Sequence, residues 1–260
     1  MQRQVSGFNF DEGVAFVAGG SGGIGAAIVH ALTAAGSDVV FTYYKNKEAA
    51  AGVQAAAAPT GARVESVQLA LEDPEAVARA LNELRTRSKI HSVIYAAGPS
   101  IPIHYVADIA HEAWVKTFAH DTHACFNLVH AALPILREQG FGSLTAVTTT
   151  QFARHVPLSV LSSAPKAAIE SMMQVVAKEY GRFGVRANSV RSGWLGGGKL
   201  ADGIGGQVQE YLAKSMRDYK SGARKDEVMA VVVRQLSDQD IEDLAAYYAG
   251  LGAEAKGGEQ

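Results

Sequence analysis

Five glycines lie close together near the start of the chain, in the run Ala18-Gly19-Gly20-Ser21-Gly22-Gly23-Ile24-Gly25. Glycine adopts the positive φ angles of tight turns, and its missing Cβ lets backbone N–H groups approach a phosphate. The run separates a short apolar segment from a helical pattern, and a helix N-terminus attracts anions. The spacing favours a pyrophosphate site of a dinucleotide, although glycine turns also serve close packing between a strand and a helix.

A second group of candidate ligands lies in the middle of the chain. His120 and His123 are three residues apart on a helical pattern, with Asp121 between them, so both imidazoles fall on one helix face. A metal site is one interpretation, but we favour surface or interface histidines and expect no metal. Cys125 follows on the same helix without a motif that would lower its thiol pKa, so we expect a small core residue.

The elements that position these residues alternate between short β-branched runs and longer Ala-rich stretches. Strands are predicted at Val14–Ala18, Asp38–Thr42, Arg63–Leu69, Ser92–Ala96, Ser143–Thr148 and Arg186–Val190. Helices are predicted at Ile24–Ala35, Lys47–Ala58, Pro74–Arg87, His111–Gln139 and Ala164–Phe183. Strands joined by helical crossovers form a parallel sheet with helices on both faces. The pattern predicts an α/β fold with a Rossmann-like, doubly wound sheet of six strands.

The pattern changes after the sixth predicted strand. Gly196-Gly197-Gly198 and then Gly203, Gly205 and Gly206 mark a break, and residues from about 207 onward read as helices. We therefore expect two parts, a Rossmann-like domain over residues 1–200 and a helical C-terminal appendage over residues 201–260.

Composition excludes several classes of protein. Of the 260 residues, 48% are hydrophobic and 19% charged, which is typical of a globular chain. The formal net charge of −2 argues against a broad basic face for nucleic acid. No apolar stretch reaches the length of a membrane span, the first ten residues lack an apolar core, and there is one cysteine. We expect a cytoplasmic protein that contacts neither membranes nor nucleic acids.

Over residues 10–195 or so, the sequence resembles the short-chain dehydrogenase/reductase family, whose glycine turn reads Thr-Gly-x-x-x-Gly-Ile-Gly. Gly19, Gly23, Ile24 and Gly25 match this turn, and Ala18 replaces its threonine. Further landmarks follow in order: Tyr95-Ala96-Ala97-Gly98 for Asn-Asn-Ala-Gly, Trp114, Leu133-Pro134, Ser162-x-x-x-Lys166 for Tyr-x-x-x-Lys, and Ser192-Gly193 for Pro-Gly. The resemblance implies an NAD(P)-dependent oxidoreductase fold.

The resemblance also implies four catalytic positions, which the family fills with Asn, Ser, Tyr and Lys. The tyrosine exchanges a proton with substrate, the lysine lowers the tyrosine pKa and binds the nicotinamide ribose, the serine orients the carbonyl, and the asparagine anchors a water. In this chain the positions carry Asp121, Thr149, Ser162 and Lys166. Only the lysine matches, so the tetrad is degenerate.

Ser162 is the most consequential of these replacements. A phenol has an ordinary pKa near 10, whereas an aliphatic alcohol is a far weaker acid and has a shorter reach. Loss of general acid–base catalysis lowers a rate by about 10²–10⁴-fold. Thr149 keeps a hydroxyl donor, and Asp121 offers only acceptors where an amide offers both. His155, in the loop between Thr149 and Ser162, is an alternative acid, although we favour a solvated loop histidine.

Positions that hold the cofactor in the family are also altered. Ala70 stands for the adenine-binding aspartate, Ala96 for the second asparagine, and Gly197 for the threonine after Pro-Gly. No acidic residue for the ribose of NAD occurs in the segment Tyr43-Tyr44-Lys45. Lys45 or Lys47 could bind the 2′-phosphate of NADP, and the alternative is that both are solvated surface lysines. We expect NAD or NADP to bind weakly or not at all, through Gly19, Gly23, Ile24, Gly25 and Lys166.

Residues from about 207 to 251 resemble the C-terminal half of a class I c-type cytochrome, with Met229 at the place of the axial methionine. The chain has no Cys-x-x-Cys-His motif, so we expect no haem and a packing role for Met229. Ser237 is a good helix N-cap, followed by acidic residues that suit the helix dipole. The alternative is that this segment represents the family's own last helices, altered in sequence.

These observations favour a non-catalytic or cofactor-poor subunit that pairs with an active paralogue in an alcohol or hydroxyacyl dehydrogenase complex. Family members associate through helices equivalent to His111–Gln139 and Ala164–Phe183, which makes a hetero-oligomer, or self-association, natural. In this respect the sequence resembles the inactive subunit of the two-subunit hydroxyacyl-CoA dehydrogenase of anaerobic toluene (benzylsuccinate) degradation, although no residue specifies that substrate. Two alternatives stay open: an active oxidoreductase that uses Thr149 with Lys166 or His155, and an NAD(P)-sensing or scaffold protein.

Overall fold

The computed structural model describes residues 10, 12–155, 157–193, 208–225 and 227–250. The chain divides into two compact units, Met1–Ser192 and Gly193–Gln260. The domain boundary predicted after residue 200 and the glycines from 196 to 206 lie outside the described residues.

The first unit is built on a six-stranded parallel sheet with the order β3-β2-β1-β4-β5-β6. The strands are β1 (Val14–Ala18), β2 (Asp38–Tyr43), β3 (Val64–Gln68), β4 (Ile90–Tyr95), β5 (Gly142–Thr149) and β6 (Val185–Ser192). The order reverses between β1 and β4, where ligands bind in doubly wound sheets. The predicted fold class is confirmed.

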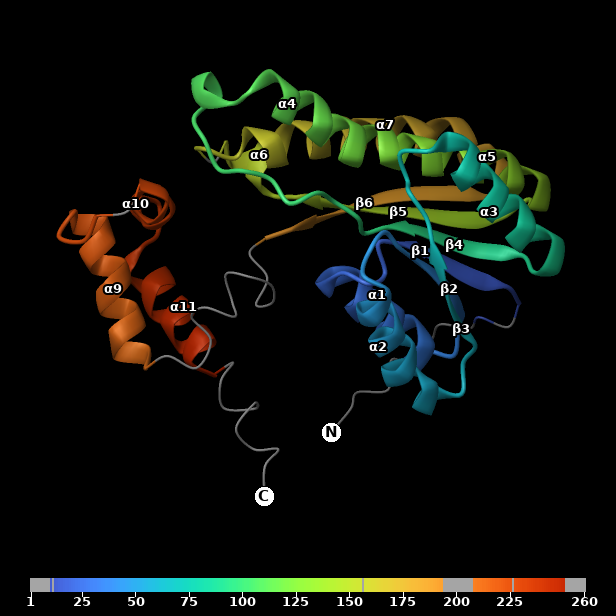
Figure 1. Cartoon of the computed structure of the whole chain (residues 1–260), viewed down its shortest axis with the longest axis horizontal. Helices are drawn as coiled ribbons and strands as arrows, with labels where there is room; N and C mark the ends of the chain where they lie inside the picture. Colours follow the sequence, from blue (N-terminus) through green and yellow to red (C-terminus); the bar gives the residue numbers. More distant parts are fainter. Residues whose placement is uncertain (1–9, 11, 156, 194–207, 226, 251–260) are drawn as a thin grey trace. The chain divides into compact units, whose positions relative to one another are not determined.

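Helices cover both faces of this sheet (Figure 1). On one face lie α1 (Gly23–Ala34) and α2 (Lys47–Ala57), and on the other lie α3 (Pro74–Arg87), α4 (His111–Phe118), α5 (Ala124–Gln139) and α7 (Val160–Tyr180). The short helix α6 (Gln151–Arg154) follows β5, and 3₁₀ turns occur at Ala58–Thr60, Val106–Asp108 and Gly181–Phe183. Two apolar clusters, one per face, fill the space between sheet and helices. None of the helices in the described ranges is long and apolar enough to cross a membrane.

Two of the predicted helices differ from the structure. The helix expected over His111–Gln139 is interrupted by a π-helical turn, η3 (Ala119–His123), which separates α4 from α5. The helix expected from Ala164 begins four residues earlier, at Val160, and ends at Tyr180. Ser162 therefore lies within α7, one turn before Lys166. Several other boundaries shift by one or two residues, as helix and strand ends commonly do.

The second unit is helical in the part that the structure describes. It contains α9 (Gln209–Ser221), α10 (Glu227–Arg234) and α11 (Asp238–Gly250). Its own small core includes Leu212, Ile241 and Ala245. The predicted N-cap is confirmed, because Ser237 Oγ accepts from the Asp240 N–H at 3.1 Å and Asp240 Oδ2 accepts from the Ser237 N–H at 2.8 Å. Met229 lies in α10 and is partly buried.

Candidate functional site

Three glycines of the turn between β1 and α1 are required by packing. Gly19 has φ +81°, and a Cβ there would lie 2.8 Å from the backbone N and Cα of Ala97. A Cβ on Gly20 would lie 2.5 Å from Phe41 Cβ, and one on Gly25 would collide with the Gly19 carbonyl. These glycines let strand, turn and helix approach one another, whatever else the turn does.

The other two glycines leave the turn open on its outer side. A Cβ on Gly22 would meet only the Gly19 oxygen, at 3.5 Å, and one on Gly23 would meet nothing within 4 Å. Ile24, in the first turn of α1, is 37% exposed. Free space at the N-terminus of a helix is what a pyrophosphate needs, so these residues fit the phosphate end of a dinucleotide.

The end of β2 flanks this turn. Thr42 Oγ1 accepts a hydrogen bond from the Gly19 N–H at 3.0 Å, which holds the first glycine in place. Tyr44 is 51% exposed, and Lys45 Nζ lies 5.0 Å from the centre of its ring. Lys45 and Lys47 are both exposed. Within the described part of the chain, no buried contact fixes the position of either side chain for binding a 2′-phosphate.

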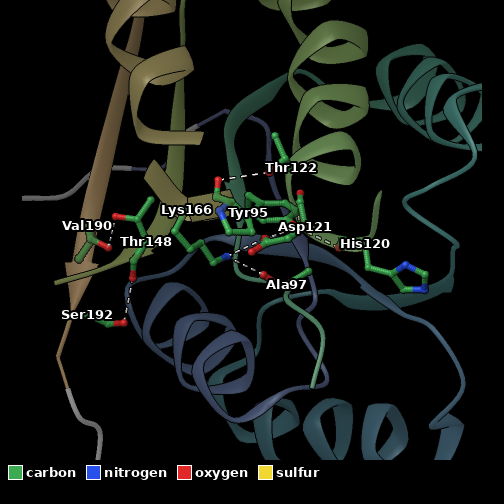
Figure 2. Close-up of polar contacts among 10 residues, drawn as sticks. Tyr95, Ala97, His120, Asp121, Thr122, Thr148, Lys166, Val190 and Ser192 are labelled. Atoms are coloured by element: carbon green, nitrogen blue, oxygen red, sulfur yellow. Dashed lines mark hydrogen bonds and ion pairs between the residues drawn. The ribbon is translucent and has the colours of Figure 1, made fainter. Parts of the chain in front are cut away.

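Lys166 is the centre of a buried polar cluster (Figure 2). Its Nζ donates to Asp121 Oδ1 at 2.9 Å and to the Ala97 carbonyl at 3.1 Å. The Lys166 side chain is 14% exposed and that of Asp121 is 4% exposed. Two of the three ammonium hydrogens are thus engaged, and the charge is balanced within the protein.

Tyr95 completes this cluster from the last position of β4. Its hydroxyl lies 2.9 Å from the Asp121 carbonyl and 3.1 Å from Asp121 Oδ1, and Lys166 Nζ lies 5.0 Å from its ring centre. Burial and then the negative charge of Asp121 raise the Tyr95 pKa well above its ordinary value. The phenol therefore remains protonated, and with 2% exposure it does not reach a substrate.

Asp121 owes its inward position to the π-helical turn. In a π turn one residue is added relative to α-helical spacing, which changes the face that its side chains present. Asp121 is 3% exposed, whereas its neighbour His120 points away from the cluster (Figure 2). Thr122 Oγ1 donates to the Pro165 carbonyl at 3.2 Å, so the same turn is tied to α7 next to Lys166.

The remaining predicted catalytic positions lie on two elements. Thr149 ends β5, and its hydroxyl accepts from the Gln151 N–H at 3.3 Å. Ser162 and Lys166 are four residues apart in α7 and share one helix face. Position 162 carries no phenol, and the phenol of the cluster belongs to Tyr95 at the end of β4. Asp121, at the position that the family fills with asparagine, forms an ion pair with Lys166, a contact that the sequence pattern did not predict.

The histidine and cysteine candidates are dispersed. His120 Nε2 lies 3.3 Å from Glu72 Oε1, while His123 and His155 are exposed. Within the described ranges, no group of three or more His, Cys, Asp or Glu side chains is arranged to hold a metal ion. Cys125 is fully buried, as predicted for a core residue, and burial raises its pKa to about 12.

A groove of about 620 Å³ lies elsewhere, between α7 and β6. Its wall includes Glu170, whose side chain is 10% exposed and accepts a hydrogen bond from Arg191 Nε at 2.9 Å. Gln174, Lys178 and Asn188 also line it. None of the predicted cofactor or catalytic residues contributes to this groove.

Sequence reasoning missed the roles of Tyr95 and Ala97, which were noted only as landmarks. The signal was present: an aromatic residue in a place that the family fills with asparagine, coinciding with Asp for Asn at position 121. At the phosphate end the residues present fit a dinucleotide, whereas Lys166, which would face a nicotinamide ribose, has two of its three ammonium hydrogens engaged by Asp121 and Ala97.

Comparison with known proteins places this geometry in a family. The family model described as Enoyl-(Acyl carrier protein) reductase matches residues 18–241. Sorbose reductase sou1 of Schizosaccharomyces pombe is 28% identical over 214 residues, covering 80% of this chain and 81% of that protein. L-rhamnose 1-dehydrogenase (NAD(P)(+)) of a Sphingomonas species is 27% identical over 248 residues, covering 93% and 94%.

A short-chain type dehydrogenase/reductase from Mycobacterium ulcerans shares the fold, with a TM-score of 0.72 and 23% identity, covering 94% of this chain and 84% of that one. The parallel sheet, the glycine turn and a family match over most of the sequence agree with one another. The chain therefore belongs to the short-chain dehydrogenase/reductase family of oxidoreductases.

Proposed function

We propose that this chain is a non-catalytic or cofactor-poor member of the family, which pairs with an active paralogue in an NAD(P)-dependent alcohol or hydroxyacyl dehydrogenase complex. The observation that carries the proposal is the state of Lys166. Its Nζ is held by Asp121 and Ala97, and Ser162 leaves it without a phenol to activate.

The acid–base chemistry of the reaction supports this proposal. Moving a proton to or from an alcohol near neutral pH needs a group whose pKa can be brought into that range. Ser162 lacks such a group, and the Tyr95 pKa moves in the wrong direction because the phenol is buried beside a carboxylate. Thr149 retains a donor for a carbonyl oxygen, but orientation alone does not supply the proton.

Turnover tests the absence of catalysis directly. The purified full chain should not oxidise NAD(P)H in the presence of a panel of ketones, sugars and acyl thioesters. Lys166→Met and Thr149→Val variants should give the same background rate as the parent. Robust turnover by the parent that falls in either variant would overturn the proposal in favour of an active enzyme with a substituted tetrad.

Purification of the native complex through a tag on this chain tests the pairing. A second family member carrying the Tyr-x-x-x-Lys motif should co-elute in fixed stoichiometry, and the complex should turn over substrate. A homo-oligomer without a second chain would contradict the paired role.

One observation favours a second candidate, a protein that binds NAD(P) without chemistry. The outer side of the glycine turn is open at Gly22 and Gly23. Calorimetry with NAD(H) and NADP(H) separates the two: a low micromolar dissociation constant without turnover supports a dinucleotide sensor or scaffold and counts against a cofactor-free subunit.

A further inference from the structure

We infer that Asp121 holds Lys166 as the cation of a buried structural brace, formed with Tyr95, and so withdraws the lysine from the nicotinamide ribose. The inference deepens the proposed function and rests on it in one respect, that the chain has no catalytic use for this lysine. It assigns Asp121 as a positioning residue that acts through Lys166.

The burial of both charges requires that they remain paired. The Asp121 side chain is 4% exposed and that of Lys166 is 14% exposed, with 2.9 Å between Oδ1 and Nζ. A buried carboxylate without a partner is strongly unfavourable, so Lys166 cannot leave Asp121 without a cost in free energy. A ribose hydroxyl is a neutral acceptor and forms weaker hydrogen bonds to an ammonium than a carboxylate does.

The remaining contacts of Lys166 also favour its present position. The Ala97 carbonyl accepts its second hydrogen at 3.1 Å, and the ring of Tyr95 lies 5.0 Å from Nζ, within the range of a cation–π contact. The ammonium is thus enclosed by an anion, a carbonyl and an aromatic face. These contacts leave one ammonium hydrogen for a ribose and hold Nζ toward Asp121.

Tyr95 explains why two replacements occur together. Its hydroxyl lies within hydrogen-bond distance of both the carbonyl and Oδ1 of Asp121, at 2.9 and 3.1 Å. The one phenol hydrogen is shared between the Asp121 carbonyl and Oδ1, and Oδ1 also accepts from the Lys166 ammonium, so both donors lie against the buried Asp121. Where the resemblance implies two asparagines, at positions 95 and 121, this chain has a donor and an acceptor that fit each other.

The brace joins three elements that are distant in sequence. Tyr95 and Ala97 end β4 and follow it, Asp121 lies in the π-helical turn, and Lys166 lies in α7 (Figure 2). The Thr122 hydroxyl adds a contact from the same turn to the Pro165 carbonyl. This arrangement stabilises the switch point of the sheet from within, where a bound cofactor would otherwise contribute contacts.

Calorimetry with NADH tests the withdrawal of the lysine. Asp121→Asn keeps the shape and the acceptor oxygen but removes the charge, so the folded variant should bind NADH at least tenfold more tightly than the parent. Adding Lys166→Met to Asp121→Asn should abolish that gain, whereas Lys166→Met alone should leave the affinity of the parent unchanged within about twofold. The inference is overturned if Asp121→Asn gives no gain, or if Lys166→Met alone weakens NADH binding tenfold.

Urea unfolding tests the brace. Lys166→Met should lower the equilibrium constant for folding by at least a hundredfold, and Asp121→Asn in the same chain should restore much of it, because no buried charge is then unpaired. Glu75→Gln, at an exposed pair with Arg79, is the matched control and should change it less than threefold. Additive losses from Lys166→Met and Asp121→Asn would contradict the brace.

The two proposals fail differently. Turnover by the parent would refute the non-catalytic role while leaving the coupling between Lys166 and Asp121 intact. An absence of that coupling would refute the brace and leave the turnover and pairing results unaffected.

Discussion

The backbone of Ala97 lies against Gly19 so closely that a Cβ on Gly19 would stand 2.8 Å from the Ala97 Cα. The carbonyl of the same alanine accepts a hydrogen bond from Lys166. The glycine turn and the lysine cluster therefore share Ala97 as a common wall. A glycine that is usually attributed to a nucleotide is needed here by the packing of the protein itself.

Gly19→Ala should destabilise the first unit by about 2–4 kcal/mol, because it combines a positive φ with a backbone collision. Gly36→Ala is a matched control, since Gly36 has φ +89° but a Cβ there would meet nothing within 4 Å. The control should lose only about 1–2 kcal/mol of unfolding free energy from backbone strain. Urea unfolding curves measure both, and equal losses would mean that Ala97 moves aside.

Restoring the phenol alone should not restore an active site. In a Ser162→Tyr variant, Lys166 still faces Asp121, so the new tyrosine lacks a free ammonium to lower its pKa. We expect NADH-linked turnover only when Asp121→Asn is combined with Ser162→Tyr. Absorbance assays of the two single variants and the double variant test this. Equal turnover by Ser162→Tyr and the double variant would show that Asp121 does not restrain the lysine.

Glu170 should make stability depend on pH in the acidic range. Hydrogen bonding from Arg191 holds the pKa of this carboxyl below its ordinary value, against the effect of burial. The pKa of Glu170 in the folded state is therefore lower than its pKa in the unfolded chain, which is about 4.3. The stabilisation is present above that pH and is lost as the pH falls through the folded-state pKa.

The difference in unfolding free energy between the parent and Glu170→Gln should accordingly shrink as the pH is lowered below about 4.3. Urea midpoints across the acidic range give this difference. Glu75→Gln is the control, because the side chains of the Arg79–Glu75 pair are 64% and 84% exposed and solvent screens them. A difference that does not change with pH for Glu170→Gln would contradict the assignment.

His91 should make folding stability depend on pH at higher pH values than Glu170 does. Burial lowers its pKa, and its ring nitrogens lie 3.1 Å from the Ser37 hydroxyl and 3.0 Å from the Ser92 hydroxyl. The unfolded chain binds the proton near pH 6.5, where the folded protein resists it, so stability should fall as the pH is lowered through about 6.5. His91→Gln should remove this slope from thermal unfolding midpoints, and His123→Gln, at an exposed histidine, should not.

Most of the fold could be predicted because its signals are local. β1 is a run of five buried residues, and α3 begins with an Asp73 N-cap followed by Pro74. The predicted bounds of both elements agree with the structure. The start of α7 was misplaced because Pro165 resembles a residue of the first helical turn, whereas the structure contains it inside the helix. The π-helical turn has no local signature, since Ala119–His123 continues an ordinary helical pattern.

The candidate site could be predicted in position but not in its contacts. Gly19 and Lys166 follow from motifs within one short segment each, and Thr149 follows from the family pattern by its spacing to Ser162. The ion pair between Asp121 and Lys166 joins residues 45 apart, and Tyr95 reaches Asp121 over 26 residues, so both depend on how β4, the π-helical turn and α7 meet. Side-chain contacts of this kind arise from tertiary packing, which a pattern of residue types does not encode.

Cys125 is the single cysteine of the chain and is fully buried, and this burial raises its pKa to about 12 against the opposing charge of Lys166. An alkylating reagent can reach this thiol only while α5 is transiently lifted from the sheet. The rate of alkylation under native conditions therefore reports how often this region opens, without any introduced label. Loosening the contact between Asp121 and Lys166 should shorten the lifetime of the closed form, and this one sulfur atom would record it.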